Sequence, residues 1–428
     1  MIARPPFRDA FRFWVKLGFI SFGGPAGQIA IMHTELVERK KWISEERFLH
    51  ALNYCMFLPG PEAQQLATYV GWLLHGMIGG IVAGLFFVIP SFFILTALSW
   101  VYVTHGAVPA VAAIFGGLRV AVLAIVVSAM IRIGRKSLKN GASFALAALA
   151  FAGLYFWHVP FPIVILSAAA IGLLGNRFRA HRSPTDSSPE PGPLDGHTRP
   201  RLSHSILVLL IGLTMWIGAL FFLSAVWGNS SVFYQMGRFF SKAAMVTFGG
   251  AYAVLPYIAQ AGVEHYHWLL PGQMIDGLGL AETTPGPLIM LVTFVGFVGA
   301  WSNAAAVALS PAMAGVLGAV VATYVTFLPC FLWIFLGAPY IEQTRGNVPL
   351  SSALGSITAA VVGVMLNLAV FFGAHVLVPE PGTFAWPAFL LAAVAFIGLW
   401  KFGWDIVYVI LVSAGIGLAC RQLGVPLG

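Results

Sequence analysis

Two acidic residues, Glu62 and Glu282, lie beside the two Pro-Gly-Pro sequences of this chain, Pro59-Gly60-Pro61 and Pro285-Gly286-Pro287. Side chains with amide or hydroxyl groups flank the same two places: Gln64, Gln65, Thr283 and Thr284. Such groups hydrogen-bond a polar solute, and a carboxyl group that is removed from water favours its protonated form. The pattern therefore predicts solute binding and proton exchange. The apolar segments hold neither the nucleophile–base pair nor the metal-ligand cluster that an enzyme would need.

Both Pro-Gly-Pro sequences interrupt long apolar segments, Phe48–Leu74 and Gly272–Val298. Each segment would be about 40 Å long as one helix, whereas a bilayer core needs only about 20 residues. Because proline removes a backbone donor and clashes with the preceding turn, each segment should be two half-helices around an unwound stretch. A matched pair of broken membrane helices indicates the binding site of a transporter. The alternative is a pair of loops that join short helices.

The composition predicts an all-α polytopic membrane protein. Apolar residues make up 59% of the chain and charged residues 9%, against roughly 45–50% and 25% in soluble domains. Long apolar runs exclude an outer-membrane barrel, whose strands alternate over about ten residues.

The formal charge of +8 comes mainly from bases at segment ends, as the positive-inside rule expects, and does not indicate nucleic-acid binding. The three cysteines are scattered and suggest no metal site, and the basic N-terminus is expected to be retained.

An internal repeat divides the chain into two homologous halves. Lys16 and Ser21-Phe22-Gly23-Gly24 recur as Lys242 and Thr247-Phe248-Gly249-Gly250, a spacing of 226 residues (16 to 242). The two Pro-Gly-Pro sequences have the same spacing. After an insertion, Val88-Ile89-Pro90 recurs as Phe327-Leu328-Pro329, 239 residues later (88 to 327). Agreement of several motifs at nearly one spacing indicates a duplication.

The predicted organisation has four parts: a first repeat (1–175), a disordered cytoplasmic linker (176–204), a joining transmembrane helix (205–226) and a second repeat (227–428). About six spans in each repeat and one joining span put an odd number of crossings between equivalent elements, so the halves should have inverted topology. The N-terminus and the linker would then be cytoplasmic. Whether residues 11–31 and 233–258 cross the bilayer or double back as re-entrant segments stays open.

At these motifs the sequence resembles the chromate transporter family in its long form with two homologous halves. The residues that carry the resemblance are Phe22-Gly23-Gly24-Pro25, Leu58 to Tyr69, Phe248 to Tyr252 and Ala281 to Leu288. The resemblance implies a bacterial inner-membrane protein that exports chromate, is driven by the proton gradient and confers chromate resistance. It also implies sulfate, an isostere of chromate, as the competing anion, and no cofactor.

A tetrahedral dianion in a membrane needs N–H groups, hydroxyls and fixed positive charge. The half-helices that should begin after Pro61 and Pro287 supply N–H groups and positive dipole ends. Gln64, Gln65, Thr283 and Thr284 are the side-chain donors of this predicted anion site. In the alternative interpretation these side chains only satisfy the carbonyl groups that the breaks set free.

Further candidates for the anion path are basic residues and glycines. Arg119 lies deep within a strong apolar span, where an ionisable residue is functional by default; a structural ion pair is the alternative. Lys16 and Lys242 could line the path, or extend to the membrane interface. Gly23, Gly24, Gly249 and Gly250 could form an N–H nest for the anion, or only allow close helix packing.

Glu62 and Glu282 are the predicted proton-coupling residues. Their negative charge would oppose anion binding unless they carry protons, so that proton flow and anion flow would be coupled. The alternative for Glu62 is capping of its own half-helix.

Two other functions stay open. The first is import or exchange of sulfate or a similar oxyanion, and the second is an anion channel, since dipoles at broken helices would suit passive flow as well. The expected partners are chromate, sulfate and membrane lipid, and a homodimer is an open alternative.

Overall fold

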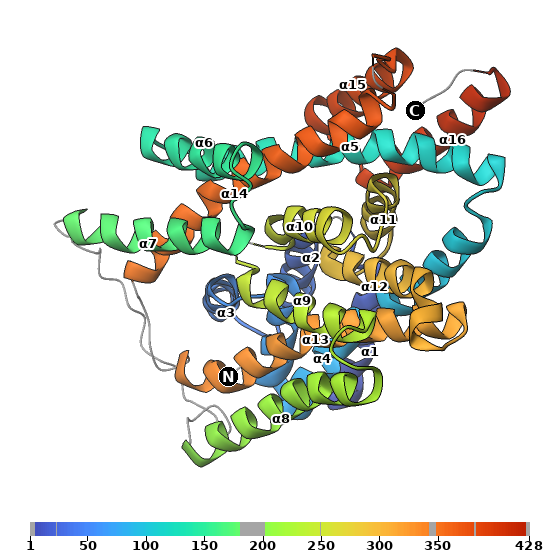
Figure 1. Cartoon of the computed structure of the whole chain (residues 1–428). Coiled ribbons are helices and arrows are strands. Elements are labelled where there is room, and N and C mark those ends of the chain that lie inside the picture. The colour runs from blue at the N-terminus through green and yellow to red at the C-terminus, as the bar shows by residue number, and fades with distance from the viewer. Residues whose placement is uncertain are drawn as a thin grey trace.

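The computed structural model describes residues 5–22, 24–179, 202–248, 250–341, 348–380 and 382–424. Every regular element within these ranges is a helix (Figure 1), which confirms the all-α class. The helices fall into two repeats that follow the same order along the chain.

The first half of each repeat consists of short, interrupted helices. In the first repeat these are α1 (Phe7–Ile20), α2 (Gly24–His33), the π-helical η1 (Thr34–Arg39), α3 (Glu45–Phe57) and α4 (Glu62–His105). Their equivalents are α9 (Val232–Val246), α10 (Ala251–Gln260), the π-helical η2 (Ala261–His265), α11 (Pro271–Thr283), η3 (Leu288–Met290) with α12 (Leu291–Ser302), η4 (Ala304–Val307) and α13 (Pro311–Ile341). The likeness extends to single residues, because Lys41 and His267, 226 positions apart, both have a φ of 52°. Because η1 and the start of α3 lie in it, the polar stretch from His33 to Arg47 is largely helical.

The helix α4 is a hairpin of two arms. His75 and Gly76 have non-helical backbone angles, and Gly76 has a φ of 64°. Across this turn Gly71 and Gly79 lie so close that a Cβ on either would clash with the other's carbonyl oxygen. In the second repeat Gly296 of α12 and Gly318 of α13 form the same contact. Each crossing that contains a Pro-Gly-Pro sequence is therefore packed against the helix that returns beside it.

The second half of each repeat forms a separate layer, in which helices are exchanged between the repeats (Figure 1). The helices α5 (Pro109–Ser137), α6 (Gly141–Tyr155) and α7 (Phe161–Arg179) belong to the first repeat, and α14 (Val348–Leu377), α15 (Trp386–Lys401) and α16 (Ile406–Gln422) to the second. The first repeat's α6 and α7 pack on α14, while α15 and α16 pack on α5. At Gly117 of α5 a Cβ would clash with the carbonyl oxygen of Ser413 in α16. The helices of each repeat in this layer are therefore covered mainly by helices of the other repeat.

The repeats are joined by α8 (Leu202–Trp227), which corresponds to the predicted joining helix. It packs on α9 and α13, and Phe221 on its outer face is 74% exposed. The predicted linker begins within α7, which runs to Arg179, and residues 180–201 lie outside the described residues.

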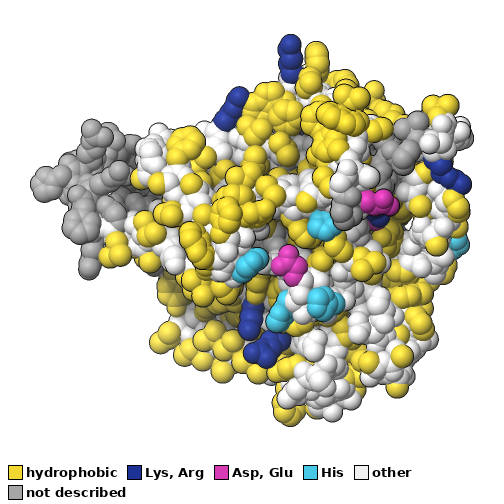
Figure 2. Space-filling view, turned by 45° about the horizontal axis from the view of Figure 1, so that its top comes forward, with side chains coloured by type: hydrophobic (Ala, Val, Ile, Leu, Met, Phe, Trp, Pro, Cys, Tyr) yellow, Lys and Arg dark blue, Asp and Glu magenta, His cyan; other side chains and the backbone are white. Residues whose placement is uncertain are grey.

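The dimensions and surface are those of a multi-pass membrane protein. Five of the described helices are long and apolar enough to cross a bilayer: Glu62–His105, Pro109–Ser137, Leu202–Trp227, Pro311–Ile341 and Ala353–Leu377. Shorter apolar helices accompany them, and apolar side chains cover most of the face in Figure 2. Fewer single helices are long enough to span than the roughly six per repeat that the sequence predicts, because several predicted spans are broken or short.

Candidate functional site

The first Pro-Gly-Pro sequence joins α3 to α4 without a helical hydrogen-bond ladder. Gly60 has a φ of 127°, which an L side chain rarely adopts. Its N–H donates to the carbonyl oxygen of Thr247 at 2.8 Å. Thr247 lies in the break between α9 and α10 of the other repeat. The backbone group that this break sets free is therefore satisfied across the repeat boundary, as burial in a membrane protein requires.

The second Pro-Gly-Pro sequence makes the matching contact. Gly286 has a φ of 112°, and its N–H donates to the carbonyl oxygen of Ser21 at 2.8 Å. Ser21 lies between α1 and α2. Four interruptions, two from each repeat, thus meet in two reciprocal pairs.

Equivalent residues of the two repeats also pack against the glycine of each Pro-Gly-Pro sequence. A Cβ atom at Gly60 would lie 2.7 Å from Sγ of Cys330, and one at Gly286 would lie 2.7 Å from Cβ of Ser91. Ser91 and Cys330 follow the equivalent prolines of α4 and α13. Neither glycine has room for a side chain, so backbone approaches backbone at both breaks.

The start of α10 links the two predicted proton-coupling acids. The carboxylate of Glu62 lies against Gly250. A Cβ atom at Gly250 would be 2.8 Å from Oε1 of Glu62. Two residues later, the hydroxyl group of Tyr252 donates to Oε1 of Glu282 at 2.9 Å. A Cβ atom at Gly24, which has a φ of 68°, would lie 3.5 Å from the Tyr252 hydroxyl oxygen. Both acids, one from each repeat, therefore approach one turn of α10.

Two of the four predicted glycines, Gly23 and Gly249, lie outside the described residues. Their neighbours Gly24 and Gly250 have positive φ values of 68° and 98°. These angles mark the chain reversals at which α2 and α10 begin.

The predicted side-chain donors bind carbonyl or hydroxyl groups of their own helices or, for Gln65, of the break before its helix. Thr283 and Thr284 both donate to the carbonyl oxygen of Leu280. The amide of Gln65 donates to the carbonyl oxygen of Pro59, and that of Gln64 to the hydroxyl of Thr68. The alternative interpretation, in which these side chains satisfy groups at the breaks, describes the contacts in this structure.

Acceptor oxygens remain around both breaks. The side-chain oxygens Oε1 of Gln28, Gln64 and Gln65 and Oε2 of Glu62 are buried and accept no hydrogen bond from other described residues. The amide nitrogen of Gln28 donates to the carbonyl oxygen of Gly286, which ties α2 to the second break. Buried polar atoms are rarely left without a partner, so this region can accept protons or hydrogen-bond donors. The sequence analysis did not single out Gln28, because its only signal is one amide in an apolar segment.

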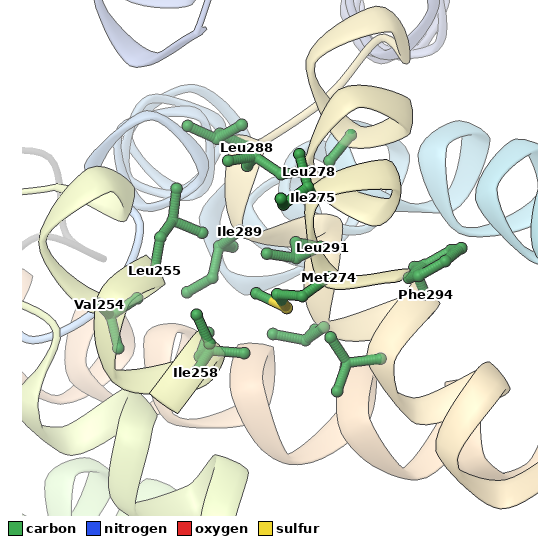
Figure 3. Packing of buried hydrophobic residues seen from close by; sticks show 14 of the residues in the cluster. Val254, Leu255, Ile258, Met274, Ile275, Leu278, Leu288, Ile289, Leu291 and Phe294 are labelled. Carbon is green, nitrogen blue, oxygen red and sulfur yellow. The ribbon is translucent and has the colours of Figure 1, made fainter. Parts of the chain in front are cut away.

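The helix starts after the two breaks differ in polarity. The first, at Glu62, carries the buried acceptor oxygens of Glu62, Gln64 and Gln65. After Pro287, by contrast, Leu288 and Ile289 pack against apolar side chains of α10 and α11, as Figure 3 shows. The sequence predicts an anion-binding helix start at both places, and only at the first do buried side-chain oxygens without a hydrogen-bond partner lie on the helix that begins there.

The predicted residue Arg119 forms an ion pair with Asp276 of α11. Its Nε donates to Oδ1 at 2.7 Å and its Nη2 to Oδ2 at 2.8 Å. The hydroxyl of Tyr102, at the end of α4, donates to Oδ2 at 2.8 Å. Asp276 was missed at the sequence level, although an acid inside an apolar segment is itself a signal of function.

A second arginine of α5 serves the other acid of α11. Arg132 interacts with both Tyr252 and Glu282. Each acid of α11, Asp276 and Glu282, therefore has an arginine from α5 and a tyrosine as neighbours. The half-helix before the second break is thus held against α5 by the ion pair of Asp276 with Arg119.

The two repeated lysines lie on exposed faces. Lys16 on α1 and Lys242 on α9 are exposed, and Arg12 and Arg238 precede them by one turn at equivalent positions. Both helices bury one apolar face. This is the arrangement of cations at a membrane interface. A role for the lysines in the anion path stays a prediction.

Comparisons with known proteins agree with this duplicated architecture. The family model described as "Chromate transporter" matches residues 8–173 and 234–418. A chromate transport protein of Pseudomonas aeruginosa is 30% identical over 96% of this chain and 92% of its own length. A chromate transport protein of Cupriavidus metallidurans is 29% identical over 87% of this chain and 84% of its own length. An uncharacterised transporter of Bacillus subtilis is 31% identical over 39% of this chain and 86% of its own length, which is about one repeat. No solved structure matches the chain.

Proposed function

The chain belongs to the chromate transporter family, and from that premise we propose that it is a secondary active transporter that exports chromate across the inner membrane in exchange for protons. In a cell such export would confer chromate resistance. The N-terminus and the central linker would lie in the cytoplasm, and the two repeats would have inverted topology.

The observation that best supports this proposal is the reciprocal pairing of the four interrupted helices. Gly60 binds Thr247 and Gly286 binds Ser21, each across the repeat boundary. Broken helices that meet at a repeat interface are where secondary transporters bind their substrates and coupling ions. Because the breaks are paired, a shift of one repeat against the other changes both at once.

The acids at the breaks support proton coupling. Glu62 and Glu282 approach residues 250–252 from different repeats. A dianion at the first helix start would be repelled by a charged Glu62, so anion binding and proton binding at this place depend on each other. The acceptor oxygens of Gln28, Gln64 and Gln65 can hold the proton donors that such an exchange requires.

The test is uptake of labelled chromate into inside-out membrane vesicles that contain the protein. We expect saturable uptake that rises when the vesicle interior is acidified and falls when a protonophore is added. Excess sulfate should compete. Uptake that ignores the gradient would overturn proton exchange, and anion conductance without counter-transport would support the channel instead.

A further inference from the structure

A cavity of about 440 Å³ lies beside the ion pair of Arg119 and Asp276. The ends of α4 and α12 and parts of α5 and α11 surround it, and its lining includes Tyr102, Phe115, Gln273 and Trp301. Asp276 lies seven residues before Thr283, the last residue of α11, or about 10 Å of helical rise. The cavity is therefore a place apart from the paired breaks, at the other end of the same half-helix.

The pair is accessible from the side of the arginine. The Arg119 side chain is 34% exposed, whereas Asp276 is completely buried. The guanidinium group presents a planar set of donors that suits the oxygens of a carboxylate or of a tetrahedral oxyanion equally well. In this structure the carboxylate of Asp276 accepts from Nε and Nη2 with its two oxygens, which leaves the other N–H groups of Arg119 on the side of the cavity.

The charges of the pair decide what the cavity can bind. With Asp276 ionised, the positive charge of Arg119 is neutralised and a dianion gains little from entering. With Asp276 protonated, one full positive charge faces the cavity and the donors of Arg119 become available. Carboxylate and dianion therefore compete for the single positive charge of the guanidinium group.

We propose that this cavity binds a tetrahedral dianion at Arg119, and that Asp276 is the competitor built into the site, which takes up a proton when the dianion displaces its carboxylate. The proposal rests on the proposed oxyanion substrate. The proton comes from water in the cavity and returns there when the anion leaves and the ion pair re-forms.

Two titratable side chains hydrogen-bond Asp276 within the described part of the chain. Arg119 from α5 and Tyr102 from α4 are the titratable side chains that interact with it. Of the other elements packed against α11, α12 and η3 have no charged residue. His105 of α4, Arg132 of α5, His375 of α14 and Arg421 of α16 are exposed, whereas Asp276 is buried.

Sulfate and selenate are the probes, because both stay dianionic across the pH range of the test, so that any linked proton belongs to the protein. Binding to the full chain in detergent is measured by calorimetry from about pH 5 to about pH 9. We expect uptake of one proton per bound dianion, obtained from buffers of different ionisation enthalpy. Above the titration of Asp276 the affinity should fall about tenfold per pH unit.

The variant Asp276→Asn should bind sulfate without proton uptake and with an affinity that no longer depends on pH. Asp405→Asn is the matched control, since Asp405 caps α16 and asparagine caps equally well; it should keep the wild-type profile. Arg119→Gln should abolish binding at this cavity. Proton uptake that is unchanged in Asp276→Asn would overturn the proposal.

A second variant decides the matter if Asp276→Asn does not fold. Tyr102→Phe removes the hydroxyl that donates to Asp276, so the carboxylate competes less well and the fall in affinity should move to higher pH. An unmoved profile would contradict the exchange. Proton-coupled chromate uptake in vesicles with pH-independent sulfate binding would refute this inference alone. Absence of chromate transport by the wild type would instead refute the proposed function.

Discussion

At the scale of single residues, the chemistry of this protein depends on which carboxylates are paired with an arginine. Asp276 is held by Arg119 through both oxygens, and Glu282 interacts with Arg132. Glu62 has no ion-pair partner among the described residues and lies against Gly250. Since removing an acid from water favours its neutral form unless a cation compensates, Glu62 is the acid whose charge is least supported by its surroundings.

Replacing each coupling acid by its neutral isostere tests this at the same scale. Glu62→Gln and Glu282→Gln should each remove the dependence of chromate uptake on the proton gradient, measured in inside-out vesicles as the ratio of uptake with and without an acidic interior. Coupling between two sites typically amounts to roughly 5- to 150-fold, so this ratio should fall from that range towards one. Glu380→Gln, at an exposed acid between α14 and α15, is the control and should keep the wild-type ratio. Gradient dependence that survives in both variants would remove these acids from the mechanism.

The sequence identifies most of the residues at the breaks, because proline, glycine and buried charge leave local signals. Arg119 and Glu282 are singled out in this way. Their partners are not, since nothing local in the sequence joins Arg119 to Asp276, 157 positions away. The same holds for Gln28 and Tyr252, whose contacts come from other repeats or distant helices.

At the scale of elements, the breaks are fixed by glycines that no other residue can replace. Gly286 combines a φ of 112° with a Cβ position 2.7 Å from Ser91. Because the breaks are bonded across the repeats, strain at one of them reaches both halves.

The variant Gly286→Ala should lower stability by about 1–3 kcal/mol, which is the usual cost of a residue held in a sparsely populated backbone region. Thermal unfolding in detergent measures this. Gly286→Ala combined with Ser91→Gly should recover part of the loss, because it removes the contact but not the backbone strain. The matched control is Gly218→Ala on α8, where nothing lies within 4 Å of the added Cβ. A fully stable Gly286→Ala protein would show that the break is not constrained as the structure has it.

The lengths of the elements follow from the sequence less well than their kind. The broken segment that the sequence predicts ends at Leu74, and the structure turns directly after it, at His75 and Gly76 of the hairpin α4. Apolar composition alone does not distinguish a short arm from a full crossing, since both are equally hydrophobic. The close approach of Gly71 to Gly79 shows that the two arms of α4 pack side by side.

At the scale of the whole molecule, the duplication that the sequence predicts extends to the backbone. The interruptions, the π-helical turns and the glycine contacts recur in both repeats. Charge does not follow this symmetry, because Arg119, Asp276 and Glu282 have no charged counterparts that pair in the same way. Inverted topology stays a prediction, since it concerns the bilayer.

Labelling at equivalent positions tests the inverted topology. Glu38 of η1 and Glu264 of η2 are exposed and 226 positions apart. If the repeats are inverted, Glu38→Cys and Glu264→Cys should react with a membrane-impermeant maleimide from opposite sides of the membrane. Cys55 and Cys330 are buried, and Cys420→Ser removes the remaining background. Reaction of both from the same side would contradict inversion.

The exchange of helices between the repeats, in the layer formed by α5–α7 and α14–α16, has a consequence for biosynthesis. When α5 leaves the ribosome, the helices that will cover it, α15 and α16, are the last to be made. The face of α5 around Gly117 therefore has no packing partner from α15 and α16 until translation is nearly finished. A chain that stops before residue 386 therefore lacks both helices that cover this face of α5.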